Sequence, residues 1–128
     1  MDKSQALYSF WSGFGIPAID EQSAYDDKAL EQLDIDFPYI TFEVQTSNLG
    51  EPVALTASLW YRSPSWGEIT RKSDEIAAYI GYGGKVLPVD GGYIWIMLGA
   101  PFAQRMAVED DGIRRIVMNI TVDFLTAV

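Results

Sequence analysis

Acidic side chains are the residues of this sequence best suited to chemistry, because the chain contains no histidine and no cysteine. Without imidazole or thiol there can be no His-based triad, and no zinc or haem site that uses either residue. The candidates for acid–base work are the carboxylates of Asp26-Asp27, Asp34 with Asp36, and Glu109-Asp110-Asp111. A catalytic dyad needs two carboxylates facing one another across an apolar pocket. These groups lie in polar sequence, so we interpret them as solvated turn and cap residues.

Other motifs resemble binding or catalytic sites but lack a necessary part. Asp110-Asp111-Gly112 is like a fragment of a calcium loop without the alternate-position ligands and the closing glutamate. The glycine-rich segment 81–85 follows a predicted helix and precedes a predicted strand, whereas a phosphate loop follows a strand and opens a helix. A hydroxyl nucleophile would need a lysine of lowered pKa as its base, and nothing in the sequence lowers one. The residues concerned are Ser63, Ser65 and Thr70, with Lys72 or Lys85. We therefore expect no enzyme activity, no cofactor and no metal.

Aromatic residues are the other unusual feature, with 4 Trp, 7 Tyr and 6 Phe in 128 residues. This is many for one small core, and Trp, Tyr and Arg dominate the hot spots of protein interfaces. We expect Trp66 and Trp95 to be buried between helix and sheet, whereas Trp60 lies on the polar face of its strand. The predicted interface residues are Trp11, Phe14, Trp60, Arg62, Phe102, Arg105, Met106, Asp110 and Asp111.

The charge of the chain restricts its partners. It carries 18 acidic and 9 basic side chains, a net charge of −9, and residues 1–36 hold eight of the acidic and only two of the basic ones. Such a field repels duplex nucleic acid and anionic membranes, and the basic groove that single-stranded nucleic acid requires is missing. We also find no membrane-spanning run and no signal peptide. A soluble protein without a membrane partner or a sequence-specific nucleic-acid partner is expected.

The elements that position these side chains are predicted from hydrophobic periodicity. Ala6, Leu7, Phe10 and Trp11 share one helix face, and Ser65-Trp66-Gly67-Glu68 has capping-box spacing before a second helix that ends at Gly81. Alternation of apolar and polar residues indicates the strands. The predicted elements are a helix over 4–12, an antiparallel hairpin of strands 39–45 and 55–62, a helix over 66–80, a hairpin of strands 86–89 and 93–98, and a strand over 114–125, with one helical turn near 29–33.

This order of elements predicts an α+β fold, with a mainly antiparallel sheet of about five strands and helices packed on one face. We expect one domain over 1–128, in which 1–36 form an acidic N-terminal helix and arm and 37–128 form the compact body. Pro88 places its strand at a sheet edge. The strand over 114–125 would span roughly 40 Å and is expected to reach beyond the core. Residues 101–112 are expected to form a long loop that is mobile in the free protein and ordered on a partner.

Two segments carry a resemblance to a known family. The sequence LTASLWYRSPSWGEI at 55–69 and the sequence FWSGFGIPA at 10–18 resemble the tail-terminator, or tail-completion, proteins of long-tailed bacteriophages and prophages. The late pair of strands and the length of the chain are also similar. The resemblance covers most of the chain as an order of elements, and it includes no catalytic signature.

The resemblance implies a structural protein of the virion, located in the tail or neck and assembled in the host cytoplasm. Such proteins form a ring of copies, usually a hexamer, that ends the tail tube and meets the head connector. The implied partners are the chain itself, the tail tube protein and the head–tail connector protein, with DNA able to pass through the ring. The alternative is a small-ligand-binding α+β domain with an aromatic-lined pocket.

Overall fold

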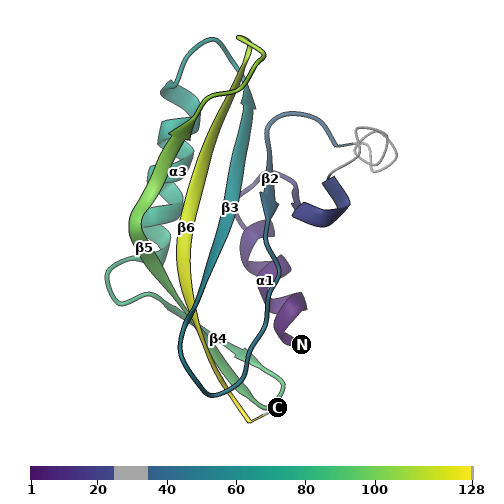
Figure 1. The fold of residues 1–128 in the computed structure, drawn as a ribbon, viewed down its shortest axis with the longest axis vertical. Helices are drawn as coiled ribbons and strands as arrows, with labels where there is room; N and C mark the ends of the chain where they lie inside the picture. The colour runs from purple at the N-terminus through teal and green to yellow at the C-terminus, as the bar shows by residue number, and fades with distance from the viewer. Residues whose placement is uncertain (25–34, 128) are drawn as a thin grey trace.

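The computed structural model describes residues 1–24 and 35–127. It contains one sheet in the order β1-β2-β3-β6-β5-β4, accompanied by two helices and a 3₁₀ turn (Figure 1). The helices are α1 (Lys3–Ser12) and α3 (Gly67–Ile80), and the turn is η1 (Glu21–Ala24). The strands are β1 (Ala18–Asp20), β2 (Tyr39–Phe42), β3 (Val53–Arg62), β4 (Lys85–Val89), β5 (Gly92–Met106) and β6 (Ile113–Thr126). The helical turn near 29–33 and the side chains of Asp26, Asp27 and Asp34 lie outside the described residues.

The predicted α+β class and the mainly antiparallel sheet are confirmed. Every neighbouring pair of strands is antiparallel except β1 and β2, which are parallel. Figure 1 shows α1 and α3 behind the same face of the sheet. The sheet has six strands instead of five, because the three residues of β1 form a strand that is too short for an alternating pattern to indicate.

The first helix is part of the core. Asp2 accepts a hydrogen bond from the Gln5 amide at 2.8 Å, while the Gln5 side chain accepts one from the Asp2 amide at 2.9 Å, which forms a capping box. The helix then buries the predicted apolar face, with Trp11 only 1% exposed. Since β1 also belongs to the sheet, the expected boundary between an arm and a body at residue 36 is corrected: residues 1–20 build the body.

The second helix, α3, begins in a different way from the prediction. Trp66 occupies the N-cap position and its side chain makes no capping bond, while the Ser65 hydroxyl accepts a hydrogen bond from the Gly67 amide at 3.0 Å. The expected capping box with Glu68 is therefore not formed. The C-terminal end is as predicted: Gly81 has φ 69°, and its amide donates to the Ala77 carbonyl at 2.9 Å.

Strand β5 replaces much of the loop that was expected over 101–112. It continues to Met106, so only residues 107–112 connect it to β6. A register shift between Leu98 and Ala103 interrupts the pairing with β6, and Pro101 lies inside this irregular part. Proline is tolerated there because β4 pairs only with residues 92–96 of β5, so the irregular part has no described strand on its outer side and does not need every ladder donor. The proline therefore indicated a loop where the chain forms an irregular strand.

Strand β6 does not reach beyond the core, contrary to the prediction. It lies in the middle of the sheet between β3 and β5. Its even-numbered side chains from Ile116 to Thr126 are all buried on the helix side. Pro88, by contrast, is on the edge strand β4 as predicted.

Candidate interaction surface

The side of the sheet opposite the helices has no covering layer in the part of the chain that the structure describes. We call this surface the open face. It is formed by alternate side chains of four strands, and aromatic or apolar residues are frequent among them. Its members include Tyr39, Thr41, Thr56, Ser58, Trp60, Arg62, Trp95, Met97, Arg115, Val117, Asn119, Thr121 and Asp123. Tyr39, Thr41 and Ser58 are themselves buried by their neighbours.

Trp60 lies on the open face as predicted, and its neighbours hold the indole in place. Its ring stacks on Tyr39 with 6.2 Å between centroids and 18° between planes. Its Nε1 donates to the Thr41 hydroxyl at 3.0 Å. The Arg115 guanidinium lies 4.8 Å from the ring centroid, and its Nε donates to the Ser58 hydroxyl at 3.1 Å. A flat aromatic platform that is already ordered loses little entropy when a partner binds to it.

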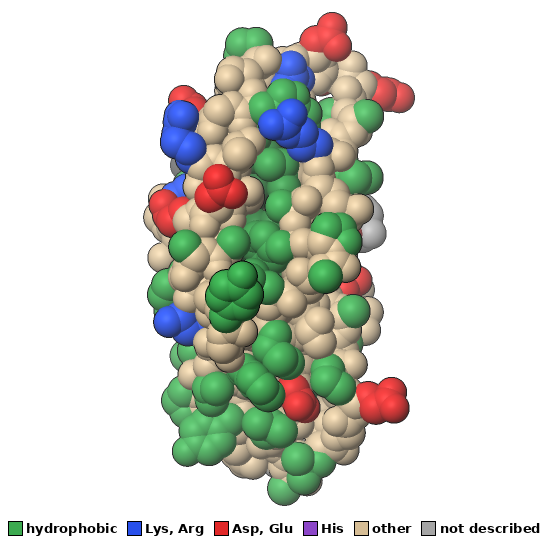
Figure 2. Space-filling model, turned by 90° about the vertical axis from the view of Figure 1, so that its left-hand side faces the viewer, with side chains coloured by type: hydrophobic (Ala, Val, Ile, Leu, Met, Phe, Trp, Pro, Cys, Tyr) green, Lys and Arg blue, Asp and Glu red, His purple; other side chains and the backbone are tan. Residues whose placement is uncertain are grey.

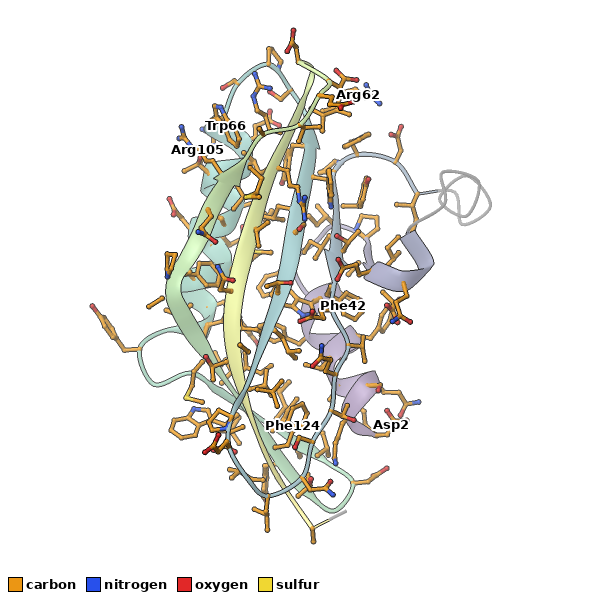
Figure 3. All side chains as sticks on the ribbon, viewed as in Figure 1. Asp2, Phe42, Arg62, Trp66, Arg105 and Phe124 are labelled. Atoms are coloured by element: carbon orange, nitrogen blue, oxygen red, sulfur yellow. The ribbon has the colours of Figure 1, made fainter. Side chains whose placement is uncertain are left out.

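A second aromatic contact lies on the helix side of the same end of the sheet. Trp66, at the start of α3, has the guanidinium of Arg105 at 4.8 Å from its centroid and that of Arg114 at 5.3 Å. Arg114 also donates to the carbonyls of Pro64 and Asp111, each at 2.9 Å. Figure 3 shows Arg62, Trp66 and Arg105 near one end of the molecule. This end therefore holds several arginines beside the acidic residues Glu109, Asp110 and Asp111 of the β5–β6 connection.

The arginines of this end are held by rings instead of carboxylates. Arg62 lies 4.6 Å from the Phe37 centroid, and the other three contact Trp60 or Trp66. Among the described residues, the ion pairs are Lys72 with Glu75 and the Met1 ammonium with Asp90. Stacking on a ring leaves the edge of a guanidinium free to bind a carboxylate in a bidentate manner.

Two of the predicted interface residues are corrected. Trp11 and Phe14 are 1% and 7% exposed, because both pack around Phe10 in the core, with ring centroids 4.9 and 5.4 Å from it. Trp95 was expected in the core, but it points to the open face and its Nε1 donates to the Gly83 carbonyl at 2.8 Å. Trp66 is only half-buried. The smaller Ile94 and Ile96 take the helix side of β5 instead.

The other predicted interface residues lie near the β5–β6 connection. Phe102 is half-buried against the core, and Met106, at the end of β5, is 40% exposed. Asp110 accepts a hydrogen bond from the Gly112 amide at 2.8 Å, which agrees with the interpretation of the acidic cluster as turn residues. Asp111 is exposed. Together with Arg62 and Arg105, these side chains lie at one end of the sheet.

Lys72 and Lys85, the possible bases for a hydroxyl nucleophile, have structural partners, whereas the buried Thr70 hydroxyl has no hydrogen-bond partner among the described residues. Lys72 donates to the Phe14 carbonyl at 2.9 Å and pairs with Glu75, while Lys85 lies over the Tyr79 ring at 4.7 Å. Residues 81–84 connect α3 to β4, as predicted. Within the described ranges, no three acidic side chains gather as a metal site would require.

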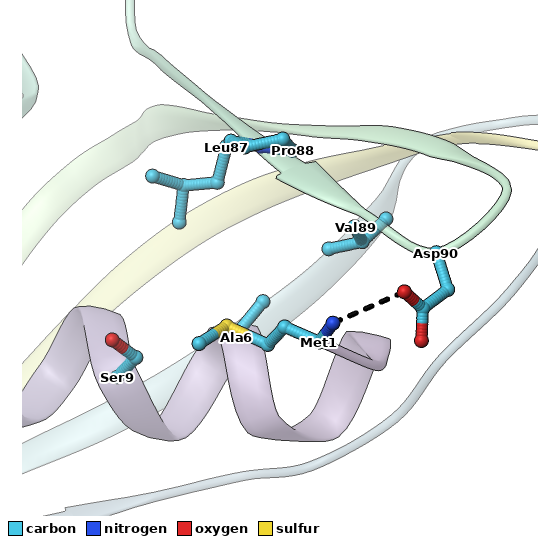
Figure 4. Close-up of a pocket in the computed structure, with 7 residues that line it drawn as sticks. All are labelled: Met1, Ala6, Ser9, Leu87, Pro88, Val89 and Asp90. Atoms are coloured by element: carbon cyan, nitrogen blue, oxygen red, sulfur yellow. Dashed lines mark hydrogen bonds and ion pairs between the residues drawn. The ribbon is translucent and has the colours of Figure 1, made fainter.

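Two hollows test the possibility of a ligand pocket. One of about 480 Å³ lies between α1 and β4 (Figure 4), where the Met1 ammonium is 3.0 Å from Asp90. Its lining is aliphatic and polar, without an aromatic ring. A smaller hollow of about 160 Å³ is lined by Phe10, Phe14 and Tyr79 among others. Typical ligand pockets are about 300 Å³ or larger, so the aromatic hollow fits only a very small molecule.

Neither described helix is long and apolar enough to cross a membrane. No protein-family model matches the chain, and no curated protein matches it.

Proposed function

We propose that this chain is a structural virion protein whose copies form a ring that ends the tail tube of a long-tailed bacteriophage and joins it to the head connector. The resemblance of segments 10–18 and 55–69 suggests this role. The observation that supports it most is the open face, a sheet surface with ordered aromatic side chains and no covering layer. Trp60, Trp95 and Met97 are half-buried on this face, and a partner that packs on it would cover the part of each side chain that remains exposed.

The open face suits contact with a flat protein surface better than contact with a small molecule. Trp60 and Tyr39 lie parallel to one another, and Arg115 and Arg62 stand beside them. Aromatic residues with neighbouring arginines are the usual centres of binding energy in interfaces. We assign this surface to the contact with the tail tube protein.

The acidic charge of the chain agrees with a ring through which DNA passes. With a net charge of −9 on each copy, a ring of copies repels phosphate and does not hold the duplex. The described residues on the open face include Arg115 but no continuous basic groove of the kind that binds a nucleic-acid strand.

The experiment mixes the purified chain with the tail tube protein encoded in the same genome. Electron microscopy and sedimentation should show tubes with a cap at one end and a shorter mean length, because a capped tube stops growing. Trp60→Ala should weaken this effect at least tenfold in the concentration required. Tyr82→Ala is the control, since Tyr82 is fully exposed in the turn between α3 and β4. Tubes of unchanged length with no bound chain would contradict the proposal.

The aromatic hollow beside Phe14 and Tyr79 favours a second function. If the chain were a ligand-binding domain, small aromatic compounds would raise its melting temperature, and the rise would grow with the logarithm of their concentration above the dissociation constant. A persistent monomer with such a shift, and without an effect on tubes, would favour this alternative.

A further inference from the structure

The outer edge of β5 is unpaired over most of its length. Strand β4 pairs only with residues 92–96, so residues 97–106 have a partner on the β6 side alone. Apart from the Pro101 carbonyl, which accepts from Asn119 at 3.0 Å, no backbone group of 97–106 makes a further hydrogen bond to the described residues. The outward N–H and C=O groups of an edge strand are free to pair with a strand of another chain.

Proteins usually protect an exposed edge strand with a proline or a bulge, and in β5 these features lie only in the middle of the edge. Pro101 and the register shift interrupt the ladder between Leu98 and Ala103. Residues 103–106 beyond it are regularly paired with β6 and exposed. Arg105 is the single charged residue of β5. Figure 2, which faces the β5 side of the molecule, shows basic and acidic side chains together towards the upper end and hydrophobic ones along the middle and the lower part.

The opposite edge of the sheet is different in length and in charge. Strand β1 is the outermost strand there, and Asp20, Glu21 and Asp36 lie at or near it. The first 36 residues carry a net charge of −6 from eight acidic and two basic side chains. A hollow of about 460 Å³ beside β1, lined by Ala18, Ile19 and Ile35 among others, leaves room for side chains of an added strand.

We infer that the β5 edge of one copy, at residues 103–106, pairs with the β1 edge of the next copy in a head-to-tail arrangement. The charges favour this pairing, because Arg105 and the nearby Arg114 then approach Asp20 and Glu21. Pairing of two β5 edges would instead bring the Arg105 side chains of the two copies together, and their like charges would repel one another. Head-to-tail contacts produce closed rings or open filaments, whereas like-to-like contacts produce dimers. Closure into a ring, but not the pairing itself, rests on the proposed function.

Engineered cysteines provide the test, because the chain has no cysteine of its own. The single variants Gln104→Cys and Ile19→Cys, whose positions both belong to the open face, and the double variant are assembled at high concentration and treated with a short bis-maleimide. We expect the double variant to give a ladder of covalent multimers on a denaturing gel, and each single variant to remain a monomer. Arg105→Glu in the double variant should reduce the ladder at least tenfold, and Asp20→Lys paired with Arg105→Glu in a cysteine-free background should restore assembly measured by sedimentation.

Each outcome decides between the inference and the proposed function. Covalent dimers of Gln104→Cys alone would show that β5 meets β5 and would overturn the inference. Multimers in sedimentation without a ladder would also overturn it, while a ring of another geometry would remain possible. A ladder from open filaments would support the pairing and contradict the closed ring. A chain that stays monomeric at every concentration and beside tail tubes would contradict both.

Discussion

Two tryptophans at opposite sides of the sheet should respond differently to truncation. Trp11 is fully buried with Phe10 and Phe14, so Trp11→Ala should lower the free energy of unfolding by about 3–5 kcal/mol. Trp60 is half-buried on the open face, and Trp60→Ala should cost on the order of 1 kcal/mol. Urea denaturation measures both values. Equal losses would contradict the assignment of Trp11 to the core and Trp60 to a surface.

The phenol of Tyr61 should make stability depend on pH in the alkaline range. Burial raises the pKa of Tyr61 above the ordinary 10.0, and the carboxylates of Glu68 and Glu75 raise it further. The unfolded chain therefore loses this proton at a lower pH than the folded protein does, so stability falls as the pH rises from about 10 through the folded pKa. Tyr61→Phe should flatten part of this fall in urea denaturation between about pH 8 and pH 11. Parallel curves for both proteins would contradict the prediction.

The amino-acid type of a side chain did not determine which face of the sheet it takes. Of the aromatic and arginine residues predicted at an interface, Arg62 and Arg105 are exposed and Trp60 is half-buried on the open face. Trp11 and Trp95 were assigned to the wrong sides. Hydrophobicity does not distinguish them, because either tryptophan could cover a core, and the choice depends on which face of the sheet the helices cover.

At the scale of elements, the short connection between β5 and β6 should be the part of this hairpin that changes on assembly. Residues 107–112 are held by the Asp110 turn, by the bond from the Arg114 guanidinium to the Asp111 carbonyl at 2.9 Å and by the bond from the Ser63 amide to the Gly112 carbonyl at 2.8 Å. Their amides should exchange faster than those of 115–118 in the free protein, and more slowly once tail tubes are added. Hydrogen exchange read by mass spectrometry measures both. Equal protection with and without tubes would contradict an ordering role for this connection.

Regular alternation predicted most strands, and its interruption caused the main error. The strands over 55–62 and 114–125 were found within two residues of their ends because their buried faces have no gap. Residues 99–106 did not alternate, since the register shift at Pro101 reverses which side chains face the helices. Ser65 shows a similar limit: it has the spacing of a capping box, but its hydroxyl already binds the Gly67 amide.

The whole molecule presents unlike edges at the two sides of one sheet. The β5 side has Arg105 and few other charges along its strand, while the β1 side belongs to the most acidic part of the chain. In a single copy, the outward backbone groups of both edges have no neighbouring strand among the described residues. Copies that pair through these edges should therefore stabilise the folded state by mass action. The melting temperature should therefore rise with protein concentration.

Above the dissociation constant of the contact, each tenfold increase in concentration adds about 1.4 kcal/mol to the apparent stability, or a few degrees in melting temperature for a domain of this size. Arg105→Glu should abolish this dependence, because it places an acidic side chain opposite Asp20 and Glu21. Arg62→Glu is the matched control: Arg62 is also an exposed arginine over an aromatic ring, but it lies on β3, away from the β5 edge. Differential scanning calorimetry over a hundredfold range of concentration measures the effect. Loss of the concentration dependence in both variants would show that the end of the molecule with Arg62 and Arg105 as a whole, and not the β5 edge, makes the contact between copies.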